Sequence, residues 1–199
     1  MKKLISGAVA LALMVTPAMA REYTVKKGDS MWKIATGFKI GLSEIKAANP
    51  GIKNADLIYP GDTLTIPEKD QGTESFVSEV VRLVNVERNK NGLSPLTEDW
   101  QLSRVAQYKA QDMHDQNYFD HQSPTYGTPF QMMKSFNVSY RYAAENIAKG
   151  QKTAEAVMNG WMNSSGHRAN ILKSDYTKIG VGYAKASDGT TYWVQIFKG

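Results

Sequence analysis

The sequence predicts an α+β protein made of two units, a small β-α-α-β module over residues 23–67 and a larger α-β-α sandwich with an antiparallel sheet over residues 76–199. Three observations lead to this prediction. A short segment with strand and helix signals comes first, and a polar stretch over 68–75 follows it as a linker. Beyond the linker, apolar residues recur at helical steps of three and four and then alternate as in strands. Helices followed by a hairpin favour a sheet covered by helices.

The first residues of the chain have the pattern of a secretory signal. A basic start at Lys2 and Lys3 precedes an apolar stretch, which ends in a small-x-small sequence at residues 18–20. This pattern predicts a signal peptide over 1–20, cleaved after Ala20. No later segment is apolar enough to cross a bilayer, so we predict a secreted, extracellular protein with no membrane span after cleavage.

Composition narrows the range of partners. Beyond residue 20 the chain holds 22 basic and 19 acidic residues and no cysteine. This weak positive charge suits a polyanionic cell wall, but the basic residues form no cluster of the kind that binds nucleic acid. Without cysteine, neither disulfides nor thiolate metal ligands are available, so packing alone must hold the core. We therefore predict a wall-associated protein with no nucleic-acid partner.

The order of elements in the small module follows from local signals. Residues 23–25 form a strand signal, and Gly28 permits a turn to Ser30, which is suited to cap a helix. A second helix begins at Leu42 and stops at 49–51, where proline and glycine cannot continue it. A proline-glycine turn then leads into an alternating strand. The predicted order is strand, helix, helix, strand.

The strings YTVKKGDSMWKIA, IKAANPGI and LIYPGDTLTIP, in this order across residues 23–67, closely resemble the LysM family. The resemblance implies binding of N-acetylglucosamine chains, as in peptidoglycan or a chitin-like glycan, in a groove between two loops. The acetamido group offers a methyl and an amide, which main-chain groups and apolar side chains can bind. Leu57 and Ile58 could equally pack the small core. The predicted carbohydrate-binding residues are Gly28, Asp29, Ser30, Met31, Asn54, Leu57, Ile58, Tyr59 and Pro60.

Helical spacing of apolar residues predicts four helices in the larger unit. They cover 76–90, a stretch from a Thr97 cap to Met113, the residues around 130–136, and a stretch from a Thr153 cap to Trp161. The remaining elements are strands. We predict one over 143–148 and a hairpin formed by 179–183 and 192–197.

Six strings in this unit look like bacterial members of the CAP (SCP-like) family, named after cysteine-rich secretory, antigen 5 and pathogenesis-related proteins. They are VNxERxxxGLxPL from 84, YFDHQSP from 118, ENIA from 145, GWMNSSGHRANIL from 160, IGVGY from 179 and YWVQIF from 192. The resemblance implies a cleft that gathers His121 and Glu145, with His167 as a third member. Asn146 and Arg168 flank these residues and are predicted to orient them through hydrogen bonds.

The chemistry of the three cleft residues allows two interpretations. Two imidazoles and a carboxylate can share protons near neutral pH, or they can supply three ligands to a divalent metal such as zinc. Each residue also has a plainer interpretation. His121 could cap a turn, Glu145 could be a buried acid satisfied by backbone donors, and His167 could lie in an exposed Gly-rich turn. His114 has no motif around it, so we interpret it as structural or solvated.

Other polar and aromatic residues have weaker functional signals. None of Ser123, Ser164 and Ser165 lies in a nucleophile turn, which argues against a serine hydrolase. The aromatic residues at helix and strand spacing are predicted to be core. These are Trp161, Tyr192 and Trp193.

The sequence departs from the family pattern at two cleft positions. Many eukaryotic CAP domains carry a second cleft histidine on a late strand and a second cleft glutamate after the helix tryptophan, whereas Trp193 and Ser164 stand there in this chain. A two-histidine metal site of that kind is therefore not expected. Any metal site would have to be rebuilt around His121, Glu145 and His167.

Three functions remain open at this point. The leading hypothesis is a cell-envelope protein held on peptidoglycan by the module, whose CAP cleft binds a ligand or a wall protein. The rival is a wall-directed hydrolase or a metal-dependent protease that uses the same cleft. The third is a lipid-binding CAP domain, as in some relatives. A LysM and a CAP domain behind a signal peptide resemble envelope and spore-associated proteins of Gram-positive bacteria.

Overall fold

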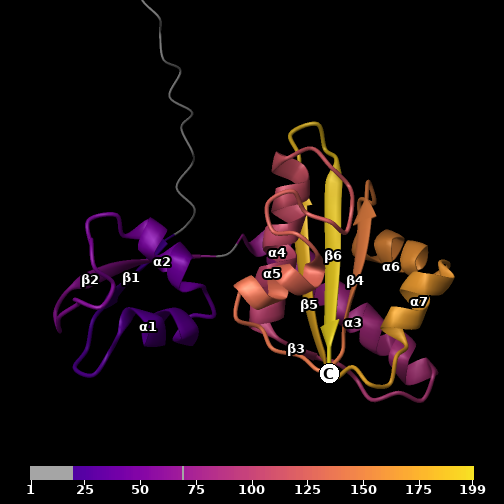
Figure 1. Cartoon of the computed structure of the whole chain (residues 1–199), viewed down its shortest axis with the longest axis horizontal. Coiled ribbons are helices and arrows are strands. Elements are labelled where there is room, and N and C mark those ends of the chain that lie inside the picture. Colours follow the sequence, from indigo (N-terminus) through magenta and orange to yellow (C-terminus); the bar gives the residue numbers. More distant parts are fainter. Residues whose placement is uncertain (1–19, 69) are drawn as a thin grey trace, which may run out of the picture.

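The computed structural model describes residues 20–68 and 70–199 (Figure 1). It holds a two-stranded sheet in the N-terminal part and a four-stranded sheet in the C-terminal part, each accompanied by helices. The predicted signal peptide over 1–20 lies outside the described residues except for Ala20, the first residue of strand β1. Within the described ranges, no helix is long and apolar enough to cross a membrane.

The small module has the predicted order of elements. It consists of β1 (Ala20–Thr24), α1 (Met31–Gly37), α2 (Leu42–Ala48) and β2 (Thr63–Pro67). The two strands are antiparallel, with Tyr23 opposite Leu64. Ser30 caps α1, as predicted, by accepting a hydrogen bond from the backbone N–H of Lys33. Apolar side chains from both helices and both strands close a single small core.

The polar stretch predicted as a linker is shorter than expected. Helix α3 (Gln71–Lys90) begins five residues before the predicted start at 76, so most of 68–75 is helical. The Asp70 carboxylate accepts hydrogen bonds from the N–H groups of Gly72 and Thr73 and so caps the helix. The linker prediction was wrong over 71–75 because polar residues that start a helix are also typical of loops.

The larger domain is an α-β-α sandwich around a sheet with the order β3-β5-β6-β4. After α3 its elements are β3 (Thr97–Glu98), α4 (Trp100–Asp115), α5 (Pro129–Ser135), β4 (Ala143–Lys149), α6 (Ala154–Met162), α7 (Ser165–Ile171), β5 (Lys178–Lys185) and β6 (Thr191–Lys198). The pairs β4·β6 and β5·β6 are antiparallel, as predicted, while the very short β3 adds a parallel pair with β5.

Two details differ from the sequence prediction. Thr97 lies in β3, and Asp99 caps α4 instead, by accepting hydrogen bonds from the N–H groups of Gln101 and Leu102. The predicted Gly-rich turn around His167 is the helix α7. Glycine and serine lowered the helical signal there, whereas packing of Ile171 into the core holds the segment as a helix.

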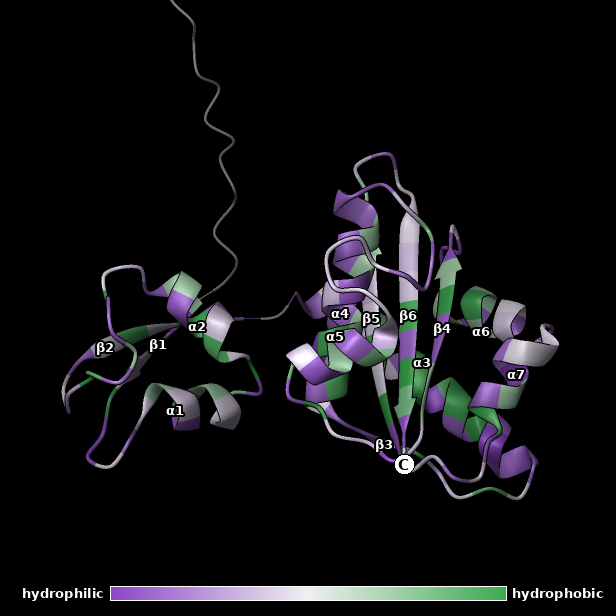
Figure 2. Cartoon of the chain, viewed as in Figure 1, coloured by the Kyte–Doolittle hydropathy of each residue, from purple (hydrophilic) through white to green (hydrophobic). Residues whose placement is uncertain are grey.

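The helices cover both faces of the large sheet (Figure 1). α4 and α5 pack on one face, and α3, α6 and α7 pack on the other. Green hydrophobic segments run along β4, β6 and α6, while much of α4 and α7 is purple on its outer side (Figure 2). Trp161 and Trp193 are fully buried, which confirms them as core.

Glycines on β5 let α4 approach the sheet closely. A Cβ atom on Gly180 or Gly182 would lie about 2 Å from the α4 backbone at Leu102 or Ala106. The alternation of glycine with large apolar residues on β5 therefore places α4 directly against the sheet. This helix carries several of the polar groups that support the candidate site.

A polar contact joins the module to the sandwich. The Arg104 guanidinium on α4 donates to the carboxylate of Glu44 and to the hydroxyl of Ser43, both at the start of α2. It also lies over the rings of Tyr108 and Phe136. The two domains therefore meet at an ion pair that rests on an aromatic surface.

Candidate functional site

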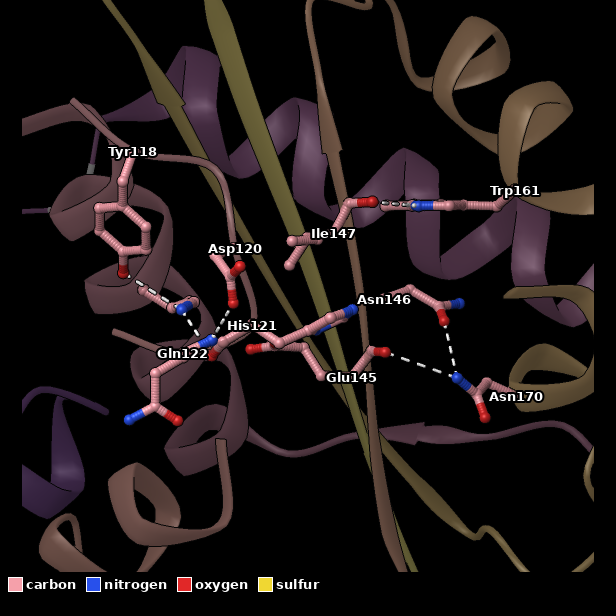
Figure 3. A network of polar contacts seen from close by, with 10 residues as sticks. Tyr118, Asp120, His121, Gln122, Glu145, Asn146, Ile147, Trp161 and Asn170 are labelled. Atoms are coloured by element: carbon pink, nitrogen blue, oxygen red, sulfur yellow. Dashed lines mark hydrogen bonds and ion pairs between the residues drawn. The ribbon is translucent and has the colours of Figure 1, made fainter. Parts of the chain in front are cut away.

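The structure brings two of the predicted cleft residues into direct contact. Glu145 lies on β4, and His121 lies in the loop after α4 (Figure 3). The distance from His121 Nδ1 to Glu145 Oε1 is 2.6 Å. The Glu145 side chain is only 2% exposed, whereas that of His121 is 55% exposed. A buried carboxylate thus holds an imidazole at the protein surface.

The electrostatics of the pair favour a charged imidazole. The hydrogen bond to Glu145 raises the pKa of His121, with partial opposition from burial. Since the carboxylate accepts, Nδ1 carries the shared proton, and Nε2 is the ring nitrogen that has no hydrogen-bond partner among the described residues. The second oxygen of Glu145, Oε2, is buried and has no hydrogen-bond partner among the described residues. The pair can therefore donate or accept a proton at Nε2 of a half-exposed imidazole.

Strand alternation decides which groups meet at the site. Along β4, Ala143 and Ile147 pack with α4, while Ala144 and Ala148 pack with α3 and α6. Glu145 belongs to the first set and so faces the α4 side, where the His121 loop lies. Its neighbour Asn146 faces the opposite side, towards α7.

His167 is half-buried near the start of α7. Burial lowers its pKa, and the charge of His121 lowers it further, so the two imidazoles share one electrostatic environment. However, across residues 20–68 and 70–199 no group of three or more His, Cys, Asp or Glu side chains is placed to hold a metal ion. The arrangement of His121, Glu145 and His167 therefore does not fit the three-ligand zinc site that was one predicted alternative.

Asn146 connects the site to α7 through backbone and side-chain hydrogen bonds. Its Nδ2 donates to the His167 carbonyl and to Gln195 Oε1, both at 3.1 Å. Its Oδ1 accepts from Asn170 Nδ2 at 2.8 Å (Figure 3). Asn146 thus holds the helix that carries His167 rather than the imidazole itself. Arg168 is exposed, and its side chain forms no hydrogen bond or ion pair with any residue that the structure describes.

The serine positions offer no nucleophile next to the histidines. Ser123 is buried, and its hydroxyl donates to Asp112 and accepts from the N–H groups of Thr125 and Tyr126. Ser164 stands at the N-cap of α7, and Ser165 is exposed. None of these hydroxyls forms a hydrogen bond with either imidazole.

Sequence reasoning missed the polar groups beneath the His121 loop. Lys109 and Asp112 are buried on α4 and form hydrogen bonds with this loop. Tyr118 and Ser123 are among their partners in the loop. Lys109 occurs at the same helical spacing as the apolar residues of α4, so the spacing alone does not distinguish it from them. The available signal was the charge itself, since lysine is rarely buried without a reason.

In the module, the two predicted loops lie side by side. The N–H of Val25 donates to the Asp62 carbonyl at 2.8 Å, and the N–H of Gly61 donates to the Val25 carbonyl at 2.9 Å. Gly28 adopts a positive φ of 90°, which supports the turn before α1. Asp29 accepts hydrogen bonds from the Tyr23 hydroxyl and the Lys26 N–H, so its carboxylate stabilises this turn.

The predicted groove residues of the module differ in exposure. Leu57 and Tyr59 are 57% and 62% exposed, so both side chains are available to a ligand. Ile58 packs partly against the core, and Met31 is fully buried in it. Asn54 and Pro60 are exposed. Trp32, which the sequence analysis did not single out, is also largely exposed on α1.

A cavity of about 290 Å³ lies at the contact between the two domains. Its lining includes Ile40 and Glu44 from the module and Trp100, Arg104 and Tyr108 from α4. His121 and Glu145 are not part of it. We place the candidate site at the His121–Glu145 pair because there a buried carboxylate holds a half-exposed imidazole.

Comparison with known proteins assigns both domains. The model of the CAP family, described as the cysteine-rich secretory protein family, matches residues 81–197, and the LysM domain model matches residues 23–67. The chain therefore belongs to the CAP family, and its CAP domain follows a LysM domain. This combination supports an association with the cell wall.

The relatives agree with this assignment. The Bacillus subtilis protein YkwD is 54% identical over 137 residues, which cover 69% of this chain and 52% of YkwD. SpoIVD-associated factor A of the same organism is 40% identical over 47 residues, or 24% of this chain and 12% of that protein. An extracellular SCP-domain protein from Bacillus anthracis has a solved structure with 31% identity and a TM-score of 0.59, covering 70% of this chain and 47% of that one. The chain spans about half the length of YkwD.

Proposed function

We propose that this is a secreted protein of the bacterial cell envelope, in spores or growing cells, whose LysM domain binds peptidoglycan or a chitin-like glycan. Its CAP domain presents the His121–Glu145 pair to a ligand or a wall protein. The signal pattern over 1–20 supports export, and the two domain matches support the wall as its location.

The exposure of Leu57 and Tyr59 carries the glycan-binding part of this proposal. Large apolar side chains that stand out from a folded surface favour a binding role when a loop holds them in place. Here the backbone bonds of Gly61 and Asp62 to Val25 fix their loop against the Gly28 turn. An acetamido sugar would contact these side chains through its methyl group and the loop backbone through its amide.

Retention of the protein on purified sacculi tests whether the LysM domain binds peptidoglycan. We expect Leu57→Ala and Tyr59→Ala each to weaken retention about tenfold, because each removes apolar area worth roughly 1.5 kcal/mol when buried. Phe130→Ala is the matched control, since Phe130 is an exposed aromatic residue of the CAP domain. Deletion of residues 23–67 should abolish retention. Unchanged retention after this deletion would contradict the proposal.

A second candidate function, hydrolysis of wall glycan or peptide, is supported by the geometry of the His121–Glu145 pair. A carboxylate at Nδ1 fixes the tautomer of the imidazole and leaves Nε2 to act as a general base or acid. Glu145 would hold His121, and Nε2 would take a proton from an attacking water. A metal-dependent version of this reaction has less support, because the three predicted ligands do not assemble.

Activity assays separate the two candidates. The protein is incubated with peptidoglycan and with peptide substrates, with and without a chelator, beside His121→Ala and Glu145→Gln. A product that forms in the presence of chelator and disappears in both variants would support the hydrolase. No product under any condition would reject it and leave ligand binding as the function of the pair.

A further inference from the structure

Lys109 is a buried cation on the apolar face of α4. It is 1% exposed and shares this face with Val105, Ala106 and Met113. Burial lowers its pKa, while the charges of Glu145, Asp112 and Asp120 act in the opposite direction. A methionine or leucine would pack here without the free-energy cost of a buried charge. Lysine at this position therefore indicates a role beyond packing.

The ammonium of Lys109 binds the loop that carries His121. Its Nζ donates to the backbone carbonyl of His121 at 2.9 Å and to the hydroxyl of Tyr118 at 3.1 Å. Figure 3 shows Tyr118 and His121 close to one another in the same part of the loop. The contact with the carbonyl acts on the same residue whose ring meets Glu145. Lys109 thus restrains the backbone from which the imidazole extends.

Asp112, one turn further along α4, fixes the loop on both sides of His121. It accepts three hydrogen bonds from loop hydroxyls, from Tyr118 at 2.5 Å, Ser123 at 2.7 Å and Thr125 at 2.6 Å. Tyr118 connects the two α4 residues, because its hydroxyl accepts from Lys109 and donates to Asp112. Burial, together with Asp112, raises the pKa of Tyr118, so its hydroxyl stays protonated in this role.

We propose that Lys109 is a positioning residue for the candidate site. Its ammonium holds the His121 carbonyl so that the imidazole stays in contact with Glu145, and Tyr118 and Asp112 hold the ammonium in turn. This inference rests on the proposed role of the His121–Glu145 pair. It predicts that a substitution of Lys109, which lies beneath the loop, alters the position of the His121 imidazole although the two side chains are not in contact.

Proton NMR of the full chain tests the proposal. A proton held between an imidazole and a carboxylate gives a signal far downfield of the amides, and Glu145→Gln identifies the His121 signal by removing it. We expect Lys109→Met to remove most of this signal, because a mobile imidazole exchanges its proton with water. Lys109→Gln keeps a donor near the carbonyl without the charge, so it should retain part of the signal.

The possible outcomes distinguish positioning from mere stability. A lower Tm for Lys109→Met with an unchanged downfield signal would overturn the proposal. Should that variant fail to fold, Lys109→Gln takes its place, and a downfield signal as strong as that of the wild-type chain would overturn the proposal equally. Absence of the downfield signal from the wild-type chain would contradict the His121–Glu145 site itself. Sacculus retention reports separately on the LysM anchor and should be the same in all of these variants.

Discussion

The LysM module and the CAP domain use buried polar groups in different ways. Among the module's described residues, Asn49 is the one buried polar side chain, and Leu57 and Tyr59, which are proposed to bind glycan, are exposed. The CAP domain buries several charged side chains, among them Arg88, Lys109, Asp112 and Glu145. Its candidate site is thus an imidazole at the surface, and buried charged side chains hold it in place.

The two domains need different properties from their cores. A binding loop needs a rigid backbone and exposed apolar groups, which a small apolar core can supply. A proton-exchanging group needs a fixed tautomer and a controlled charge, and these require polar partners that water does not reach.

Replacing Arg88 should have the largest effect on the CAP domain. Its guanidinium is fully buried and donates to four backbone carbonyls, those of Ser94, Ile171, Lys173 and Tyr176. Arg88→Ala removes all four of these hydrogen bonds from a buried region, so we expect a loss of at least about 3 kcal/mol in the free energy of unfolding. Urea unfolding followed by tryptophan fluorescence measures this. Arg82→Ala, on the exposed side of the same helix, is the control and should change little.

The corresponding change in the module should be smaller. Asn49 Nδ2 donates to the carbonyls of Ile45 and Thr65, and its Oδ1 accepts from the Thr65 N–H. We expect Asn49→Ala to lose about 1–3 kcal/mol, because it leaves neutral rather than charge-assisted partners unsatisfied. Hydrogen exchange of the Thr65 amide reports the loss. Asn54 is exposed, so Asn54→Ala is the control. The same loss of stability in that variant would contradict the role of the Asn49 hydrogen bonds.

The His121–Glu145 pair should make the stability of the CAP domain depend on pH. Since Glu145 raises the pKa of His121 in the folded state, the stabilisation is fully present below the unfolded value of 6.5 and is lost as the pH rises through the raised folded pKa. An NMR titration of His121 and a series of Tm values against pH measure both effects. In Glu145→Gln the pKa of His121 should fall. An unchanged titration would show that the pair is not coupled.

The contact between the domains should contribute least to stability. Arg104 and Glu44 are partly exposed, so Arg104→Met should cost at most about 1 kcal/mol. Its main effect should be greater freedom of the module relative to the sandwich, seen as a larger radius of gyration in small-angle scattering. Arg168→Met, an exposed arginine outside this contact, is the control. Equal scattering from all three proteins would mean that the ion pair does not hold the domains together.

Much of the fold could be predicted from the sequence because its signals are local. Ser30 caps α1 and α2 ends at Asn49, and in both cases the hydrogen-bond partner in the helix lies only a few positions away. The alternation in 192–197 directly predicts β6. The errors at the start of α3 and at α7 arose where local composition and tertiary packing disagree. Polar residues open α3 as a cap, and Ile171 holds a Gly- and Ser-containing segment in a helix.

The candidate site was predictable only in part. The family resemblance pointed to His121 and Glu145, which lie 24 positions apart, but no local pattern brings the two side chains together. Lys109 could not be recognised as part of the site, because it occurs at the same helical spacing as its apolar neighbours. The metal alternative could not be judged from the sequence either, because a set of possible ligands does not say whether they converge, and the part of the chain that the structure describes holds no such group.

The two domains, their order and most of their helices and strands can be predicted from the chain alone, because they depend on caps, turns and periodicity within short segments. Three features of the candidate site become visible only in the folded protein: Glu145 is buried beneath His121, Lys109 and Asp112 hold the His121 loop, and Asn146 binds α7 instead of an imidazole. These contacts join segments distant in the chain. Their energies come from burial and from hydrogen bonds across the sheet, which no short stretch of sequence encodes.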